Sequence, residues 1–127
     1  MVLEHISIYT DDLERLKHFY VKYFSGTPNE KYKNPNTGLE TYFITFDGGA
    51  RLELMGKPGL AEHDRSVQSY GLTHLAFRIG ARDQVDSLTE TFVKDGYRLK
   101  SGPRETGDGY YKSCILDPDG NEVEITA

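Results

Sequence analysis

The stretch Gly120-Asn121-Glu122-Val123-Glu124-Ile125 near the C-terminus matches Gly49-Ala50-Arg51-Leu52-Glu53-Leu54, which lies 71 residues earlier. A second match, at an offset of 69, joins Leu72-Thr73-His74-Leu75-Ala76-Phe77-Arg78 to Leu3-Glu4-His5-Ile6-Ser7-Ile8-Tyr9. All four segments alternate polar and apolar residues, which is typical of strands with one buried face. Because the two matches recur at nearly the same spacing, the sequence predicts two copies of one structural module.

Each copy also contains one apolar stripe at helical spacing. In the first copy Asp11 and Glu14 resemble a capping box at the start of the helix, and Gly26 and Pro28 are expected to end it. In the second copy the helix is expected from about Asp83. Its apolar stripe consists of Val85, Leu88, Phe92 and Val93. Strands are expected over residues 2–9, 39–46, 50–55, 72–79, 97–100, 110–116 and 121–126, with a polar loop over 102–109.

The two copies account for most of the 127 residues. Residues 1–56 are predicted to form the first module and 72–127 the second, with the polar stretch 57–71 as a linker. A half of about this size buries too little apolar surface to be comfortably stable alone. The two modules are therefore predicted to share a single domain.

Composition narrows the class of protein. The net charge of −5 lacks the basic footprint of a nucleic-acid-binding protein. The single cysteine, Cys114, rules out an intramolecular disulfide and fits a reducing compartment. No apolar run approaches the roughly 20 residues that a membrane helix needs, and no secretory signal is visible. We therefore expect a cytoplasmic protein that binds neither nucleic acid nor membranes.

Four potential metal ligands fall at matching positions of the repeat. His5 and His74 lie on the polar faces of the first strand of each copy, and Glu53 and Glu124 on those of the last. If the apolar faces pack on the helices, all four side chains leave the opposite face of the sheet. Two imidazoles and two carboxylates suit a first-row divalent ion such as Zn, Ni, Fe, Co or Mn. Glu122 shares this parity and is interpreted as a rim carboxylate, whereas His18 and His63 have no counterpart in the repeat.

These motifs, together with the turn Asp117-Pro118-Asp119-Gly120, resemble those of the vicinal oxygen chelate superfamily. That superfamily includes glyoxalase I, bleomycin-resistance proteins, fosfomycin-resistance enzymes and extradiol dioxygenases. The resemblance extends from Leu3 to Ile125. It implies an α+β fold in which two βαβββ modules form an open eight-stranded cup, with the helices on its outer face. It also implies a homodimer, whose cup is closed either within one chain or by exchange of modules.

The pattern resembles most closely the metal set of glyoxalase I, carried over onto His5, Glu53, His74 and Glu124. This implies a metal-dependent lyase or isomerase acting on a hemithioacetal of an α-ketoaldehyde. One glutamate, Glu53 or Glu124, would transfer the proton while the metal stabilises an enediolate. The sequence does not rank the two glutamates.

The substrate-binding positions depart from glyoxalase I. Tyr9 and Lys57 stand where that enzyme has the arginine and asparagine that hold glutathione, so a glutathione substrate is doubtful. Arg78 is a candidate for binding an anionic substrate group. Tyr110 and Tyr111 are further candidates to contact the substrate, although such a pair more often contributes one core and one surface residue.

Other members of the superfamily supply the alternatives. Fosfomycin-type thiol transfer and extradiol dioxygenation resemble sites with three protein ligands, and a fourth ligand at Glu53 argues against both. A non-catalytic protein of the bleomycin-resistance type, which binds its small molecule without a metal, is the alternative outside the enzymes.

Overall fold

The computed structural model describes all residues, 1–127, and the chain divides into two compact units. The first comprises Met1–His63 and the second Asp64–Ala127. The boundary between them falls inside the stretch that was predicted to be a linker, residues 57–71. That the two modules share one domain stays a prediction.

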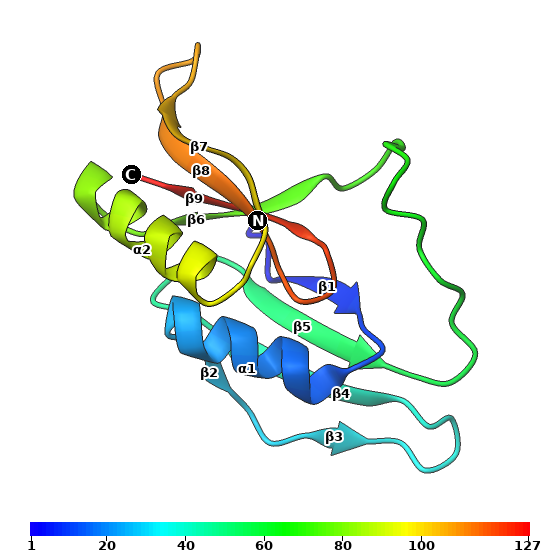
Figure 1. Cartoon of the computed structure of the whole chain (residues 1–127). Helices are drawn as coiled ribbons and strands as arrows, with labels where there is room; N and C mark the ends of the chain where they lie inside the picture. Colours follow the sequence, from blue (N-terminus) through cyan, green and yellow to red (C-terminus); the bar gives the residue numbers. More distant parts are fainter. The chain divides into compact units, whose positions relative to one another are not determined.

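The first unit is one helix on one mixed sheet (Figure 1). The strands run in the order β1-β5-β4-β2, and β3 adds to β4. Strand β1 is parallel to β5, and the other pairs are antiparallel. The elements are β1 (His5–Tyr9), α1 (Leu13–Phe24), β2 (Thr27–Pro28), β3 (Tyr32–Lys33), β4 (Glu40–Thr45) and β5 (Arg51–Gly56).

The second unit repeats this topology. Its strands run in the order β6-β9-β8-β7, with β6 parallel to β9. Its elements are β6 (His74–Arg78), α2 (Arg82–Lys94), β7 (Leu99–Glu105), β8 (Tyr111–Leu116) and β9 (Glu122–Thr126). The predicted α+β class with two βαβββ modules is therefore confirmed, and β3 is an addition to the first module.

Each helix buries its apolar stripe against its own sheet. In the first unit Leu16, Phe19 and Tyr20 of α1 are fully buried, as are Ile44 and Leu54 of the strands beneath. The second unit has its own set of fully buried side chains: Val85, Phe92, Ile115, Val123 and Ile125. Burial of one such side chain contributes about 1.5–3 kcal/mol. The face of each sheet that carries the alternate, polar residues is left without a helix of its own unit.

The predicted ends of the first helix were wrong by one residue, for reasons of local hydrogen bonding and backbone conformation. Helix α1 is capped by Asp12, not Asp11, because the Asp12 carboxylate accepts the backbone N–H of Arg15 at 3.0 Å. The helix ends at Phe24, and Ser25, one residue before Gly26, caps it in the left-handed conformation. Pro28, expected only to end the helix, lies in the short edge strand β2, where a missing N–H is tolerated.

Two predictions for the second unit also need correction. Val93 was assigned to the buried stripe of α2 but is 51% exposed. Strand β7 continues to Glu105, through the beginning of the predicted polar loop 102–109. Gly102 and Pro103 are typical of loops and made this stretch look like one. The pairing of β7 with β8 has two register irregularities, and the second, between Ser101 and Arg104, spans these two residues.

Neither helix is long and apolar enough to cross a membrane.

Candidate metal centre

The first unit brings His5 and Glu53 together on the polar face of its sheet. Parallel pairing sets Ser7 of β1 opposite Glu53 of β5, and His5 is one alternate position away on the same face. His5 Nε2 lies 3.7 Å from Glu53 Oε2. The Ser7 hydroxyl donates a 2.5 Å hydrogen bond to the same oxygen. The Glu53 carboxylate is thus held beside the imidazole by a neutral donor.

The His5 ring is fixed from its other side. Its Nδ1 lies 2.5 Å from Glu4 Oε2, and Arg51 Nε donates to Glu4 Oε1 at 2.7 Å. The His5 hydrogen bond, assisted by Arg51, lowers the pKa of the Glu4 carboxyl. Phe43 meets the imidazole edge to face, with 5.3 Å between the ring centroids. A hydrogen bond from Nδ1 to Glu4 leaves the lone pair of Nε2 directed away from Glu4, as a metal ligand requires.

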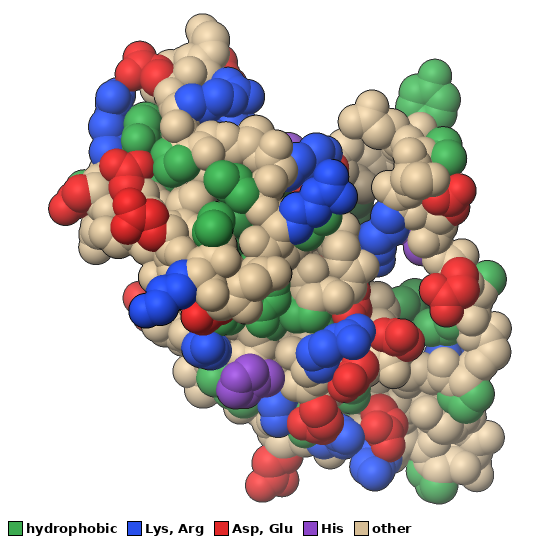
Figure 2. All heavy atoms as spheres, viewed as in Figure 1, with side chains coloured by type: hydrophobic (Ala, Val, Ile, Leu, Met, Phe, Trp, Pro, Cys, Tyr) green, Lys and Arg blue, Asp and Glu red, His purple; other side chains and the backbone are tan.

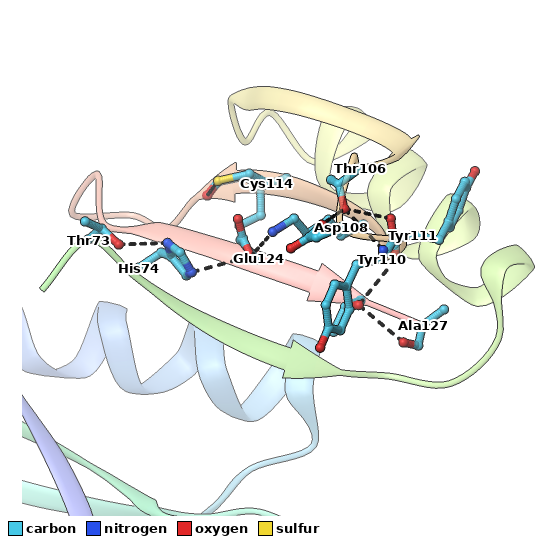
Figure 3. Close-up of polar contacts among 12 residues, drawn as sticks. Thr73, His74, Thr106, Asp108, Tyr110, Tyr111, Cys114, Glu124 and Ala127 are labelled. Atoms are coloured by element: carbon cyan, nitrogen blue, oxygen red, sulfur yellow. Dashed lines mark hydrogen bonds and ion pairs between the residues drawn. The ribbon is translucent and has the colours of Figure 1, made fainter.

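The second unit contains an equivalent pair (Figure 3). His74 Nε2 lies 3.4 Å from Glu124 Oε2, and Thr73 Oγ1 lies 2.9 Å from Nδ1. Here Ala76 stands opposite Glu124, where the first unit has Ser7. Lys112 instead donates from Nζ to Glu124 Oε2 at 2.9 Å. Both copies of the repeat therefore place an imidazole and a carboxylate side by side, with different neighbours.

The turn before β9 fixes the position of Glu124 along its strand. The buried Asp117 carboxylate accepts the backbone N–H groups of Asp119 and Asn121, both at 2.9 Å. It also accepts the Asn121 amide at 2.8 Å. Gly120 has a φ of +82°, which a residue without a side chain adopts readily. This network determines where β9 begins and hence which of its residues share a face with His74.

The spacing within each pair suits shared coordination of one ion. A first-row ion about 2.0–2.2 Å from each atom would separate the two ligands by about 3.4–3.6 Å at an angle of about 110–120°. The observed separations of 3.7 and 3.4 Å are close to this range. The structure contains no cluster of three or more His, Cys, Asp or Glu side chains that could hold a metal ion. The structure thus brings the four predicted ligands together as two pairs, one in each unit.

The predicted substrate contacts Tyr9 and Arg78 lie on the same sheet faces as these pairs. Tyr9 follows His5 at an alternate position of β1, is 49% exposed, and has Lys57 Nζ 5.4 Å from its ring centroid. Arg78 is the corresponding residue of β6, is exposed, and makes no ion pair. Both side chains are therefore accessible on the same sheet face as an imidazole, four residues further along the strand.

Tyr111 requires a correction. Its hydroxyl donates to Asp86 of α2 at 2.6 Å, and the Arg82 guanidinium lies 4.9 Å from its ring centroid. The Asp86 hydrogen bond raises the pKa of the Tyr111 phenol. Tyr111 thus lies on the helix face of its sheet, away from the face that carries His74. Tyr110 precedes β8 and is 50% exposed, and its predicted contact with a substrate stays a prediction.

Cys114 lies opposite Glu124 in the strand register but does not have the properties of a nucleophile. Its side chain is buried, and burial, reinforced by the negative charges of Glu122 and Glu124, raises the pKa of the thiol to about 11. A protonated, buried thiol is unreactive. Cys114 is therefore a small buried residue of β8.

Three residues beside the pairs were not singled out by sequence reasoning: Glu4, Ser7 and Lys112. Ser7 could have been found, because it alternates with His5 on the polar face of the first strand. Lys112 is harder to find. The short turn between β8 and β9 sets the register that brings Lys112 near Glu124, but the direction of the lysine side chain depends on its surroundings in the folded sheet.

Comparisons with known proteins identify the class. Residues 2–125 match the model of the Glyoxalase/Bleomycin resistance protein/Dioxygenase superfamily, so the chain belongs to that family. A Bacillus subtilis relative, the uncharacterized protein YqjT, is 27% identical over 98% of both chains. Another from the same organism, the uncharacterized protein YwkD, is 28% identical over 97% of this chain and 94% of its own.

Solved structures agree on the fold. Glyoxalase I from Zea mays superimposes with a TM-score of 0.79 at 22% identity, over 98% of this chain and 44% of that one. Lactoylglutathione lyase from Agrobacterium tumefaciens gives a TM-score of 0.68 at 22% identity, over 98% of this chain and 92% of its own. At such identities the similarity shows the fold alone.

Proposed function

We propose that this protein is a divalent-metal-dependent lyase or isomerase of the glyoxalase I type. Its substrate is a small molecule with vicinal oxygens, such as the hemithioacetal that methylglyoxal forms with a thiol. His5, Glu53, His74 and Glu124 are the proposed ligands of one divalent ion. The observation that carries the proposal is the repeated His–Glu pair, with 3.7 Å between Nε2 and Oε2 in one unit and 3.4 Å in the other.

A bound divalent ion would act as a Lewis acid towards the two substrate oxygens. The protein's own part is proton transfer: one carboxylate, Glu53 or Glu124, takes a proton from one substrate carbon and returns it to the neighbouring carbon. The substrate is isomerised without net gain or loss of atoms or electrons. Both glutamates are largely shielded from water, with side chains 14% and 17% exposed, which favours retention of the transferred proton.

The thiol is proposed to be other than glutathione. Tyr9 and Lys57 occupy the positions at which the resemblance to glyoxalase I leads us to expect an arginine and an asparagine. In their place the chain presents an aromatic ring and a lysine, with Lys57 Nζ 5.4 Å from the centroid of the Tyr9 ring. Arg78 is proposed to bind an anionic group of the substrate. We also propose that the protein acts as a homodimer, as the resemblance implies.

The test combines metal analysis with turnover. Purified protein is loaded in turn with Ni, Zn, Co and Mn ions, and methylglyoxal conversion is followed with several small thiols. We expect at least one ion to bind and to support turnover, and Glu124→Gln to abolish both. Glu122→Gln is the matched control, because Glu122 lies on the same strand and face but pairs with Lys100.

Each possible failure has a distinct meaning. If none of the four ions binds, the metalloenzyme proposal is wrong, and a metal-free binding protein becomes the better hypothesis. If a metal binds without turnover of any hemithioacetal, the site stands and the proposed substrate is wrong. If Glu124→Gln binds metal as the original protein does, the ligand set is wrong.

A further inference from the structure

Glu124 has a charged partner that its counterpart Glu53 lacks. Lys112 Nζ lies 2.9 Å from Glu124 Oε2, the same oxygen that faces His74 Nε2 at 3.4 Å. The Lys112 side chain is 25% exposed and that of Glu124 17%. Because both charges are partly withdrawn from water, the interaction is screened less than an ion pair at the open surface.

The repeated fold does not require this lysine. Lys112 stands opposite Thr126 in the β8–β9 register, and the equivalent position of the first unit is Thr41, opposite Met55. Thr41 is buried and uncharged. The carboxylate of Glu53 is held by the Ser7 hydroxyl instead. The first module therefore folds with a neutral hydrogen-bond donor for Glu53. Since folding does not require a cation at this position, the presence of Lys112 beside Glu124 calls for a functional explanation.

The charges of the proposed site supply that explanation. Two glutamates neutralise one divalent ion, so once Glu124 is a ligand, the charge of Lys112 is no longer balanced. An unbalanced ammonium ion beside a metal ion disfavours metal binding, because like charges repel. A monoanionic ligand removes this penalty, since a carboxylate accepts charge-assisted hydrogen bonds from lysine. Arg78, exposed and without an ion pair on the same face, adds to the positive charge there.

We propose that Lys112 is a specificity-determining residue, which selects substrates that carry a carboxylate next to their vicinal oxygens. In this structure Glu124 neutralises its ammonium ion, and the substrate carboxylate takes over that role when a divalent ion engages Glu124. The inference rests on the metal site proposed above and narrows its substrate to hemithioacetals that also carry a carboxylate beside the two oxygens, so the uncharged methylglyoxal adduct is the weaker substrate. Lys112 touches the substrate in this scheme but transfers no proton.

The experiment compares two small ligands that differ in charge. Protein is loaded with Mn(II), whose free concentration is followed by electron paramagnetic resonance. Binding of pyruvate and of hydroxyacetone, its neutral analogue, is then followed by water-proton relaxation. The variants are Lys112→Met, Lys112→Arg and the control Lys100→Met. Lys100 is suitable because it pairs with Glu122, which is not a proposed ligand.

We expect the original protein to prefer pyruvate to hydroxyacetone. Lys112→Met should bind Mn(II) about tenfold more tightly and pyruvate about tenfold more weakly, with hydroxyacetone unchanged. Lys112→Arg should retain the preference for pyruvate, and Lys100→Met should behave as the original protein does. Opposite shifts for metal and pyruvate would not arise from general damage to the fold, which weakens both.

The inference is overturned if the original protein shows no preference for pyruvate. It is also overturned if Lys112→Met leaves that preference intact, or if Lys100→Met removes it equally. Absence of Mn(II) binding to the original protein, confirmed with Ni, Zn and Co, would overturn the proposed metal site itself and this inference with it. Binding of Mn(II) without selectivity would overturn the inference alone.

Discussion

At the scale of single residues, the two His–Glu pairs differ in what holds them. His5 is oriented by the carboxylate of Glu4, which is itself held by Arg51. His74 is oriented by the hydroxyl of Thr73. Carboxylates that hydrogen-bond the second ring nitrogen of a ligating histidine fix its orientation and raise its basicity. The imidazole of the first pair is therefore the more firmly oriented and the more basic of the two, whereas the second pair has the additional cation Lys112.

Replacing Glu4 should weaken metal binding. Glu4→Ala leaves the His5 ring without its partner, and loss of such a partner typically costs about 10–100-fold in metal affinity. The dissociation constant for Zn(II) is measured by competition with a chelating dye at neutral pH. Thr73→Ala, the matched variant at the equivalent position of the second unit, should have a smaller effect because a neutral partner is removed. Unchanged affinity in Glu4→Ala would contradict the proposed orientation of His5.

At the scale of elements, a charged network joins α1 to its sheet. Glu14 of α1 accepts the hydroxyl of Tyr42 of β4 at 2.9 Å, and the Nζ atoms of Lys17 and Lys31 each lie 2.8 Å from a Glu14 oxygen. Figure 2 shows positive and negative side chains interleaved over the region of α1, β3 and β4. Tyr42 is only 8% exposed, so Glu14 connects the helix to a core residue. Hydrogen bonds from Lys17 and Lys31 lower the pKa of Glu14 to about 2.

The first unit should therefore lose stability in acid. A folded-state pKa of about 2, below the ordinary value of 4.5, means that the contribution of Glu14 is complete above pH 4.5. It is lost as the pH falls towards 2. Urea unfolding between pH 2.5 and about 5, followed by circular dichroism, measures this dependence. In Glu14→Gln the free energy of unfolding should fall less steeply over that window.

Glu30→Gln provides the control for this measurement, because Glu30 is exposed and forms no ion pair. Its acid dependence should match that of the original protein. An equally steep fall in Glu14→Gln would show that other carboxyl groups dominate acid unfolding, and that the network around Tyr42 contributes little.

At the scale of the whole molecule, the defining feature is repetition. Both units order their sheets in the same way, and in both the first strand is parallel to the last. This symmetry places one imidazole and one carboxylate on each sheet. A stable first-row site usually has four ligands, or three ligands and a water molecule. A single pair falls short of that number, so each unit alone should bind an ion only weakly.

We accordingly expect one tightly bound metal ion per chain. His5→Ala and His74→Ala should each abolish tight binding, because both residues are proposed ligands of the same ion. The measurement is metal content per chain after loading and dialysis, with protein concentration from amino-acid analysis. Two ions per chain, with one retained in each single variant, would mean that the pairs act independently.

The extent to which the structure follows from the sequence differs between features. The repeat, the element order and the strand faces were predictable, because alternation with a period of two is a direct consequence of strand geometry. Helix ends were missed by one residue, since Asp11 and Asp12 are both competent caps and only backbone geometry selects Asp12. Strand β7 was partly missed, since its glycine and proline are typical of loops.

The sequence by itself determined the family, the two modules and the four residues proposed to hold a metal, because these depend on local pattern and its repetition. Only the tertiary structure decided which side chains surround each pair. Tyr111 turned out to face Asp86 of α2, and Lys112 to face Glu124. The Tyr111 contact depends on how α2 packs on its sheet, and the Lys112 contact on the direction that a long, flexible side chain takes across the sheet face. Both are set by packing between elements, which a local pattern of polar and apolar residues does not specify.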